Sequence, residues 1–326
     1  MAYQPDRRRE QAAAYLSAKL GRPVAVTALA RLSTGHSRET LMVATDLPDR
    51  PDFVFRIEQG GVLGTSSEPE FRLLQALYGG PVPVPRPLWL EDDPQWFGFP
   101  FMVTERVDGY GGIDYLQDPI EKVKVLREYV QTIAQLHSYS PQELGLGQMG
   151  IPRDTREATL RQIEYWADIY RRYRFVHEPI VDEAILWLKR NVPDPKRPVA
   201  LIHGDLSFGN FILRDDRVVA HIDWEWSNLG DPMEDVAFFA YVKGRAFAPP
   251  EETIALFRQY SKFRWTDAEL RYWEVFNYVK CAAANIATLK VFCEGRNYGL
   301  NMVAIGTGGF LGFTARLAEA LRRRAL

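Results

Sequence analysis

The sequence predicts an α+β fold in which strands and helices are segregated along the chain. Runs rich in β-branched and aromatic residues lie before residue 106, whereas apolar residues recur at helical spacing from residue 110 onward. Two further apolar runs, 199–202 and 218–222, interrupt the helical part as short strands. This arrangement favours a small sheet followed by a mainly helical unit.

The N-terminal part is expected to begin with a helix over 4–20 that stops at Gly21. A second helix over 66–78 carries Glu68 and Glu70 in its first turns. Strands are expected at 24–32, 40–45, 53–57, 88–91 and 99–105.

The chain breaks at Asp108-Gly109, so we place a boundary near 106–109 that separates residues 1–107 from residues 108–326. The second part is mostly helical. Its helices are expected at 119–139, 155–175, 179–191, 231–242, 251–260, 266–294 and 302–324.

Composition and charge exclude several classes of protein. The net charge is −2, without the basic field of a nucleic-acid-binding protein. No apolar run approaches 18 residues, so we expect no membrane partner. Cys281 and Cys293 lie about 18 Å apart along one predicted helix and cannot pair, which favours reduced thiols and a cytoplasmic location. The oligomeric state stays open.

The residues with the clearest chemistry lie between 203 and 235. The segment H-G-D ends at Asp205 and is followed five positions later by Asn210, and the segment I-D-W-E contains Asp223. Phosphoryl transfer from ATP needs an acid beside the acceptor hydroxyl and oxygen ligands for magnesium. We therefore expect Asp205 to be the catalytic acid and Asn210 and Asp223 to be Mg²⁺ ligands.

Three ordered motifs, H-G-D-x-x-x-x-N, I-D-W and G-D-P-x-x-D at 230–235, resemble the signature of the aminoglycoside phosphotransferase and choline kinase-like small-molecule kinases. The I-D-W-E form together with Arg56 most resembles the branch of kinase domains fused to acyl-CoA dehydrogenases. The resemblance covers nearly the full chain. It implies a two-lobed protein-kinase-like fold, with a small antiparallel-sheet lobe for the nucleotide and a helical lobe for the catalytic loop and the acceptor.

The resemblance also implies where ATP binds. A polar loop between the first two strands would cover the phosphates, although its single glycine fits a plain hairpin turn equally well. The chain between the two lobes would bind the adenine edge. The residues concerned are Ser33, Thr34, Gly35, His36 and Ser37 in the loop, and Thr104, Glu105 and Val107 in the hinge.

Arg56 occupies the position in the third strand where the family usually has Lys. Strand alternation places Val54 and Arg56 on one face. Arginine can hold a phosphate through two parallel hydrogen bonds, and its expected ion-pair partner is Glu70, with Glu68 as second choice. The alternatives are a surface arginine on an outer strand and a different phosphate-binding cation, Arg38 in the polar loop.

These observations favour an ATP- and Mg²⁺-dependent phosphotransferase that acts on a hydroxyl of a small molecule. An aminoglycoside, an amino alcohol and a hydroxyacyl metabolite are competing acceptors. The alternative is a non-catalytic, pseudokinase-like nucleotide-binding protein. A protein kinase is disfavoured because no A-P-E element is present.

Overall fold

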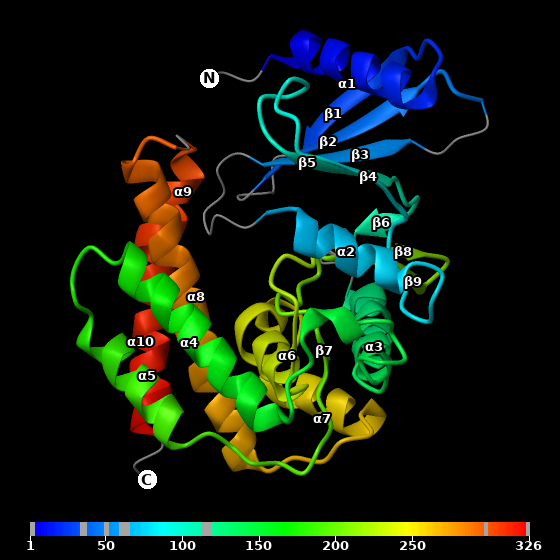
Figure 1. Ribbon diagram of the computed structural model, residues 1–326. Coiled ribbons are helices and arrows are strands. Elements are labelled where there is room, and N and C mark those ends of the chain that lie inside the picture. The colour runs from blue at the N-terminus through cyan, green and yellow to red at the C-terminus, as the bar shows by residue number, and fades with distance from the viewer. Residues whose placement is uncertain are drawn as a thin grey trace.

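The fold combines an antiparallel sheet in the N-terminal part with a helical C-terminal part, which confirms the predicted α+β class (Figure 1). The computed structural model describes residues 4–32, 38–48, 52–58, 66–111, 119–296 and 299–323. In Figure 1 the sheet lies at the top, and the helices fill the lower part.

The N-terminal sheet has five antiparallel strands in the order β1-β2-β3-β5-β4. They are β1 (Val26–Leu32), β2 (Arg38–Thr45), β3 (Phe53–Glu58), β4 (Pro87–Glu91) and β5 (Phe101–Glu105). Each lies where the sequence predicted a strand, with one correction of consequence. Arg38, which we expected in the polar loop, is the first residue of β2, because it continues the ladder opposite Glu58.

The two faces of this sheet have different environments. Helix α1 (Pro5–Leu20) covers one face, where the Tyr15 ring packs against Phe55 and Phe101 at 5.9 and 4.8 Å between centroids. The buried positions of β3 alternate, so Arg56 lies on the other face. That face looks toward α2 (Glu68–Leu77) and the helical part (Figure 1).

The helical part is organised around α8, the longest helix among the described residues, which packs against α4, α6 and α10. Thr266 and Glu269 form a capping box at its start. The helices are α3 (Pro119–Leu136), α4 (Thr155–Tyr173), α5 (Pro179–Arg190), α6 (Met233–Phe238), α7 (Pro250–Tyr260), α8 (Asp267–Cys293), α9 (Leu300–Ala304) and α10 (Phe310–Arg322), with shorter turns η2 (Gly147–Met149), η3 (Phe239–Lys243), η4 (Gly244–Ala246) and η5 (Ile305–Gly309).

The predicted helix over 302–324 is continuous from α9 through η5 to α10, with a wider turn at η5. The turn brings Gly306 against Leu289 of α8, where a Cβ would lie 2.3 Å from the Leu289 Cβ. None of the described helices combines the length and the apolar character needed to cross a membrane. Both cysteines are free thiols on α8.

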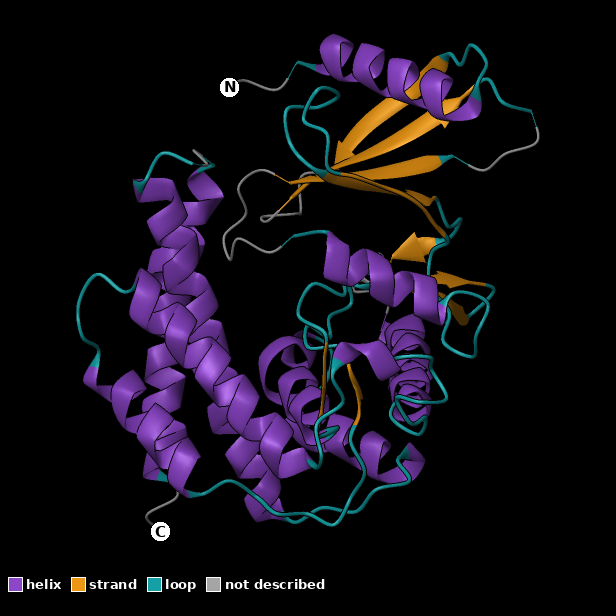
Figure 2. Cartoon of the chain, viewed as in Figure 1, coloured by secondary structure: helices purple, strands orange, loops and turns teal. Residues whose placement is uncertain are grey.

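Two small sheets carry the predicted catalytic segments (Figure 2). One pairs β7 (Ala200–Ile202) with β10 (Asn228–Gly230), and the other joins β6 (Tyr110–Gly111), β8 (Phe211–Arg214) and β9 (Arg217–His221). We predicted β7 and β9. The other strands are two to four residues long, so their sequences carry no periodic signal.

Candidate active site

The loop after β7 is held by Asp235, a residue of α6. Its two carboxylate oxygens accept hydrogen bonds from the backbone N–H groups of His203 and Gly204, each at 2.9 Å. His137 Nε2 lies 2.9 Å from the same carboxylate. Gly204 has φ +85°, and a Cβ there would lie 2.2 Å from the Trp226 carbonyl oxygen, so only glycine fits.

Asp205 and Asn210 lie side by side, as the spacing predicted. Asn210 Nδ2 donates to the Asp205 carbonyl at 2.8 Å and to Asp205 Oδ2 at 3.2 Å. Both bonds use the amide nitrogen, which leaves Asn210 Oδ1 for another partner. Asp205 Oδ1 is buried and has no hydrogen-bond partner among the residues that the structure describes.

Asp223 lies in the loop after β9, two residues beyond His221. The Ile222 N–H donates to the Asn210 carbonyl at 3.0 Å, which brings Asn210 and Asp223 to the same place. Asp223 has φ +67°, a left-handed conformation that is unusual for a residue with a side chain. Trp224 fixes this loop, because its N–H donates to Glu70 at 3.3 Å and its indole to the His221 carbonyl at 3.0 Å.

Arg56 joins the sheet to this loop. Its Nη1 lies 2.5 Å from Glu70 Oε1, and its Nη2 lies 2.5 Å from Asp223 Oδ1. Glu70 is therefore the partner that the sequence indicated, whereas Glu68 pairs with Arg72 on the exposed side of α2. The Arg56 side chain is 14% exposed, which rules out the surface-arginine alternative.

Arg38 is a second arginine that pairs with Glu70. The sequence indicated Arg38 only as an alternative to Arg56. Its Nη1 pairs with Glu70 Oε2, and its Nη2 donates to the Ser66 carbonyl at 3.3 Å. The side chain is 3% exposed. The strand register explains the position: Thr40 pairs with Arg56, and Arg38 lies two residues from Thr40, on the same face of β2.

The charges in this cluster are strongly coupled. Burial disfavours the charged form of Arg56, but the carboxylates of Glu70 and Asp223 outweigh burial and raise its pKa. Burial likewise opposes ionisation of Asp223, and the Arg56 guanidinium reverses this and lowers its pKa. Burial and the Asp223 charge raise the pKa of Glu225 to about 7. Near neutral pH, Asp223 is anionic and Glu225 is only partly ionised.

His221, two residues before Asp223, is a packing residue. His221 is fully buried between the Tyr129 and Trp224 rings, and burial, followed by His203, lowers its pKa to about 3. It is therefore neutral. The described residues contain no cluster of three or more histidine, cysteine or acidic side chains arranged to hold a metal.

The predicted hinge residues lie at the end of β5. Thr104 is buried and pairs with Val54 of β3, and the Glu105 side chain pairs with Arg86 at 3.2 Å. Val107 is half-buried beyond the strand. The predicted phosphate loop, residues 33–37, lies outside the described residues.

Sequence reasoning missed Lys280 of α8, which donates to the Gly204 carbonyl and to Glu234. A signal existed, because Lys280 is the one basic residue in the apolar stretch 272–287. The two aspartates of the G-D-P-x-x-D motif have different partners. Asp231 accepts from the Met233 N–H at 2.9 Å, whereas Asp235 accepts from the backbone of the loop.

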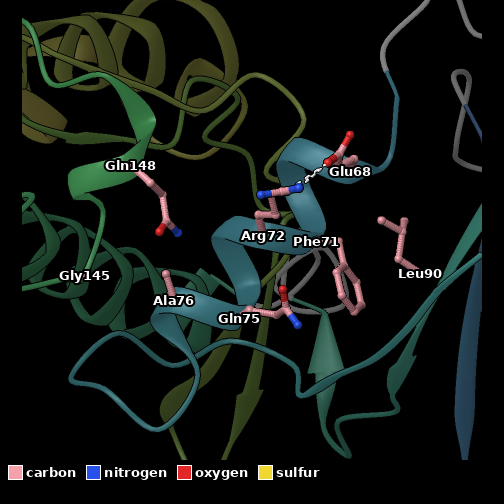
Figure 3. A pocket seen from close by; sticks show the side chains of 8 residues that line it. All are labelled: Glu68, Phe71, Arg72, Gln75, Ala76, Leu90, Gly145 and Gln148. Carbon is pink, nitrogen blue, oxygen red and sulfur yellow. Dashed lines mark hydrogen bonds and ion pairs between the residues drawn. The ribbon is translucent and has the colours of Figure 1, made fainter.

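A cavity of about 400 Å³ lies on the outer side of α2 (Figure 3). Figure 3 shows the Glu68–Arg72 pair at this cavity. The lining residues are Glu68, Phe71, Arg72, Gln75, Ala76, Leu90, Gly145 and Gln148. None of these lining residues is Asp205, Asn210 or Asp223, the predicted catalytic and metal-binding residues.

Solved structures share the fold across nearly the whole chain. A putative aminoglycoside phosphotransferase from Ralstonia eutropha JMP134 is 22% identical, with a TM-score of 0.71 over 96% of this chain and 98% of that one. Aminoglycoside phosphotransferase APH(4)-Ia, in a complex with AMP-PNP and hygromycin B, is 17% identical, with a TM-score of 0.64 over 96% and 98% of the two chains. The fold is therefore that of the kinase-like phosphotransferases.

Sequence comparison identifies the family. Residues 28–273 match the phosphotransferase enzyme family, and the chain belongs to that family. It is therefore a small-molecule kinase by class.

Curated relatives agree with the predicted branch. Acyl-CoA dehydrogenase family member 11 of Homo sapiens is 33% identical over 176 residues, which are 52% of this chain and 22% of the relative. Acyl-CoA dehydrogenase family member 10 of Mus musculus is 32% identical over 221 residues, 64% of this chain and 20% of the relative. The matched part spans about a fifth of these relatives' length.

Proposed function

We propose that this protein transfers the γ-phosphoryl group of ATP, with Mg²⁺, to a hydroxyl group of a small molecule. The observation that carries the proposal is the convergence of Asp205, Asn210 and Asp223 with the Arg56–Glu70 pair. An acceptor base, two oxygen ligands and a phosphate-binding cation are the parts that phosphoryl transfer requires. We keep residues 1–107 as the nucleotide-binding lobe and residues 108–326 as the lobe that holds the acceptor.

Asp205 accepts the proton of the acceptor hydroxyl in this proposal. Its Oδ2 is held by Asn210, while its buried Oδ1 has no partner among the described residues and is free to accept a hydrogen bond from the substrate. Because the transition state of phosphoryl transfer is loose, the main contribution of Asp205 is to orient the hydroxyl.

Asn210 and Asp223 fit Mg²⁺, which prefers hard oxygen ligands. Asn210 Oδ1 is left over once the amide nitrogen has bonded to Asp205, and the Asp223 side chain is 33% exposed with its pKa lowered. When bound, the ion neutralises charge on the phosphate oxygens. Arg56 Nη2, which pairs with Asp223 here, becomes available to a phosphate oxygen once nucleotide competes with Asp223 for it.

Outside the described residues, Ser33, Thr34, Gly35, His36 and Ser37 would cover the phosphates. Thr104, Glu105 and Val107 are proposed to bind the adenine edge. The complex of APH(4)-Ia with AMP-PNP supports ATP as the donor, since that protein shares the fold.

We rank the three candidate classes of acceptor with the support of the comparisons. The curated relatives are acyl-CoA dehydrogenase family members, which favours hydroxyacyl compounds. Aminoglycosides come second, supported by the complex of APH(4)-Ia with hygromycin B. Amino alcohols come third.

A screen of ADP release tests the proposal. Purified protein is incubated with ATP, Mg²⁺ and panels of hydroxyacyl compounds, aminoglycosides and amino alcohols. We expect one panel to raise ADP release in the wild type and not in Asp205→Asn. ATP binding without acceptor-dependent ADP release from any panel would instead favour the non-catalytic nucleotide-binding alternative.

A further inference from the structure

Lys280 is a fully buried cation directly beneath the catalytic loop. It projects from α8, and its side chain has no exposed surface. Its ammonium group donates to the Gly204 carbonyl at 2.5 Å and to Glu234 Oε1 at 2.8 Å. The aromatic rings of Trp166, Trp226 and Phe238 lie around it, with centroids 5.6, 5.3 and 5.1 Å from Nζ.

These contacts fix the peptide group that precedes Asp205. The Gly204 N–H is held by Asp235, and its carbonyl is held by Lys280. Asn210 holds the next carbonyl, that of Asp205. The backbone on both sides of the Asp205 Cα is therefore restrained from α6, from α8 and from within the loop.

A buried lysine needs a paired charge, because desolvation of an unpaired ammonium group is costly. Glu234 supplies the compensating charge and the three rings a favourable cation–π environment. An apolar side chain of similar length would fill the same space without this requirement. What it could not do is donate a hydrogen bond to Gly204.

We infer that Lys280 is a positioning residue, which sets the place of the Asp205 carboxylate through the Gly204 carbonyl. The inference rests on the proposed function, since it gives Asp205 the acceptor proton. The inference gives α8, which lies far from the motifs in sequence, a role in positioning Asp205.

The test compares four purified variants. Lys280→Met removes the donor and keeps the apolar stem. Glu234→Gln removes the buried countercharge but leaves the amine free to bond with Gly204. The double variant removes both charges, so that no unpaired charge stays buried. Lys290→Met, on the same helix, replaces a lysine whose Nζ lies 4.9 Å from the centroid of the Phe175 ring, and serves as the matched control.

Hydrogen exchange gives a measurement that needs no turnover. In the absence of nucleotide, we expect amides 203–210 to exchange at least about tenfold faster in Lys280→Met, with α10 unchanged. Lys290→Met should match the wild type. A uniform rise over the whole helical part would show that Lys280 is merely structural, and unchanged exchange at 203–210 would overturn the inference.

Turnover supplies the second measurement, with the acceptor that the screen identifies. A displacement of about 1 Å costs roughly 100-fold in rate, so kcat should fall by about 10- to 100-fold in Lys280→Met while the KM for ATP stays within about twofold. The double variant should show the same loss. A folded double variant with the kcat of the wild type would overturn the inference. If the wild type itself releases no ADP, the proposed function fails, and the exchange measurement alone decides whether Lys280 anchors the loop.

Discussion

Arg56 of β3 and Asp223 of the loop after β9 form an ion pair between the small sheet and the helical part, with 2.5 Å between Nη2 and Oδ1. They are 167 residues apart in sequence. The same guanidinium also bonds to Glu70 of α2, so one arginine joins three separate elements. This pair brings the proposed phosphate-binding cation next to the proposed metal ligand.

Arg56→Ala is expected to raise the KM for ATP and to lower kcat together. A charge-assisted contact contributes about 1.5–3 kcal/mol, which corresponds to a loss of roughly 10- to 150-fold in kcat/KM. Arg56→Lys should recover only part of the loss, because Lys keeps the charge without the planar fork. Steady-state kinetics at varied ATP measures both. If Arg56→Ala is kinetically silent, another cation holds the phosphates, and Arg38 is the first candidate.

Asp205→Asn is expected to lower the rate of acceptor phosphorylation by about 10²–10⁴-fold while ATP binding is retained. The amide keeps the size of the side chain but cannot take a proton. Turnover and the Kd for ATP should be measured on the same preparation. Turnover within threefold of the wild type would remove Asp205 from the catalytic role.

Asp223→Ala is expected to reduce the thermal stabilisation that ATP and Mg²⁺ together give to the wild type. Asp223 is the anionic member of the proposed ligand pair, and its lowered pKa keeps it charged near neutral pH. A thermal-shift titration, with and without Mg²⁺, makes the comparison. An unchanged Mg²⁺-dependent shift in a stably folded variant would exclude Asp223 as a ligand.

Arg38→Met is expected to lower the free energy of unfolding by about 1.5–3 kcal/mol, because it removes a buried charged hydrogen-bond donor from Glu70. Arg72→Met, on the same helix as Glu70, is the matched control. Its exposed pair with Glu68 should contribute no more than about 0.5 kcal/mol. Urea denaturation measures both. Equal effects would show that Arg38 adds nothing beyond a surface pair.

The raised pKa of Glu225 predicts a specific pH dependence of the free energy of unfolding. Its pKa is raised from 4.5 to about 7 in the folded protein, so its stabilising contribution is present below pH 4.5 and is lost as the pH rises through 7. Glu225→Gln should remove that loss. Between pH 5 and 7, the wild type should lose stability relative to Glu225→Gln with a slope of at most about 1.4 kcal/mol per pH unit.

His221 acts in the opposite direction, because its pKa is lowered to about 3 and its contribution is lost as the pH falls below 6.5. The difference between the wild type and Glu225→Gln cancels this term, since both contain His221. Denaturant unfolding at several pH values gives the difference. Parallel stability curves would contradict the raised pKa of Glu225.

The sequence by itself determined the order of the helices and of the longer strands and the identity of the motifs, because periodicity and glycine positions are local properties. It also indicated the Arg56–Glu70 pair, since strand alternation and an acid in the next helix leave few partners. The short strands β6, β8 and β10 were not predictable from the sequence. Pairing with other segments stabilises them more than the β-propensity of their own residues does.

Only the tertiary structure decided which charges meet. Arg38 pairs with Glu70, Asp235 accepts from the backbone of the loop, and Lys280 donates to Gly204, 76 residues away in sequence. Each is a buried charge whose cost is offset only when a partner from another element arrives. The sequence records that such a charge exists, but the packing of the elements determines its partner.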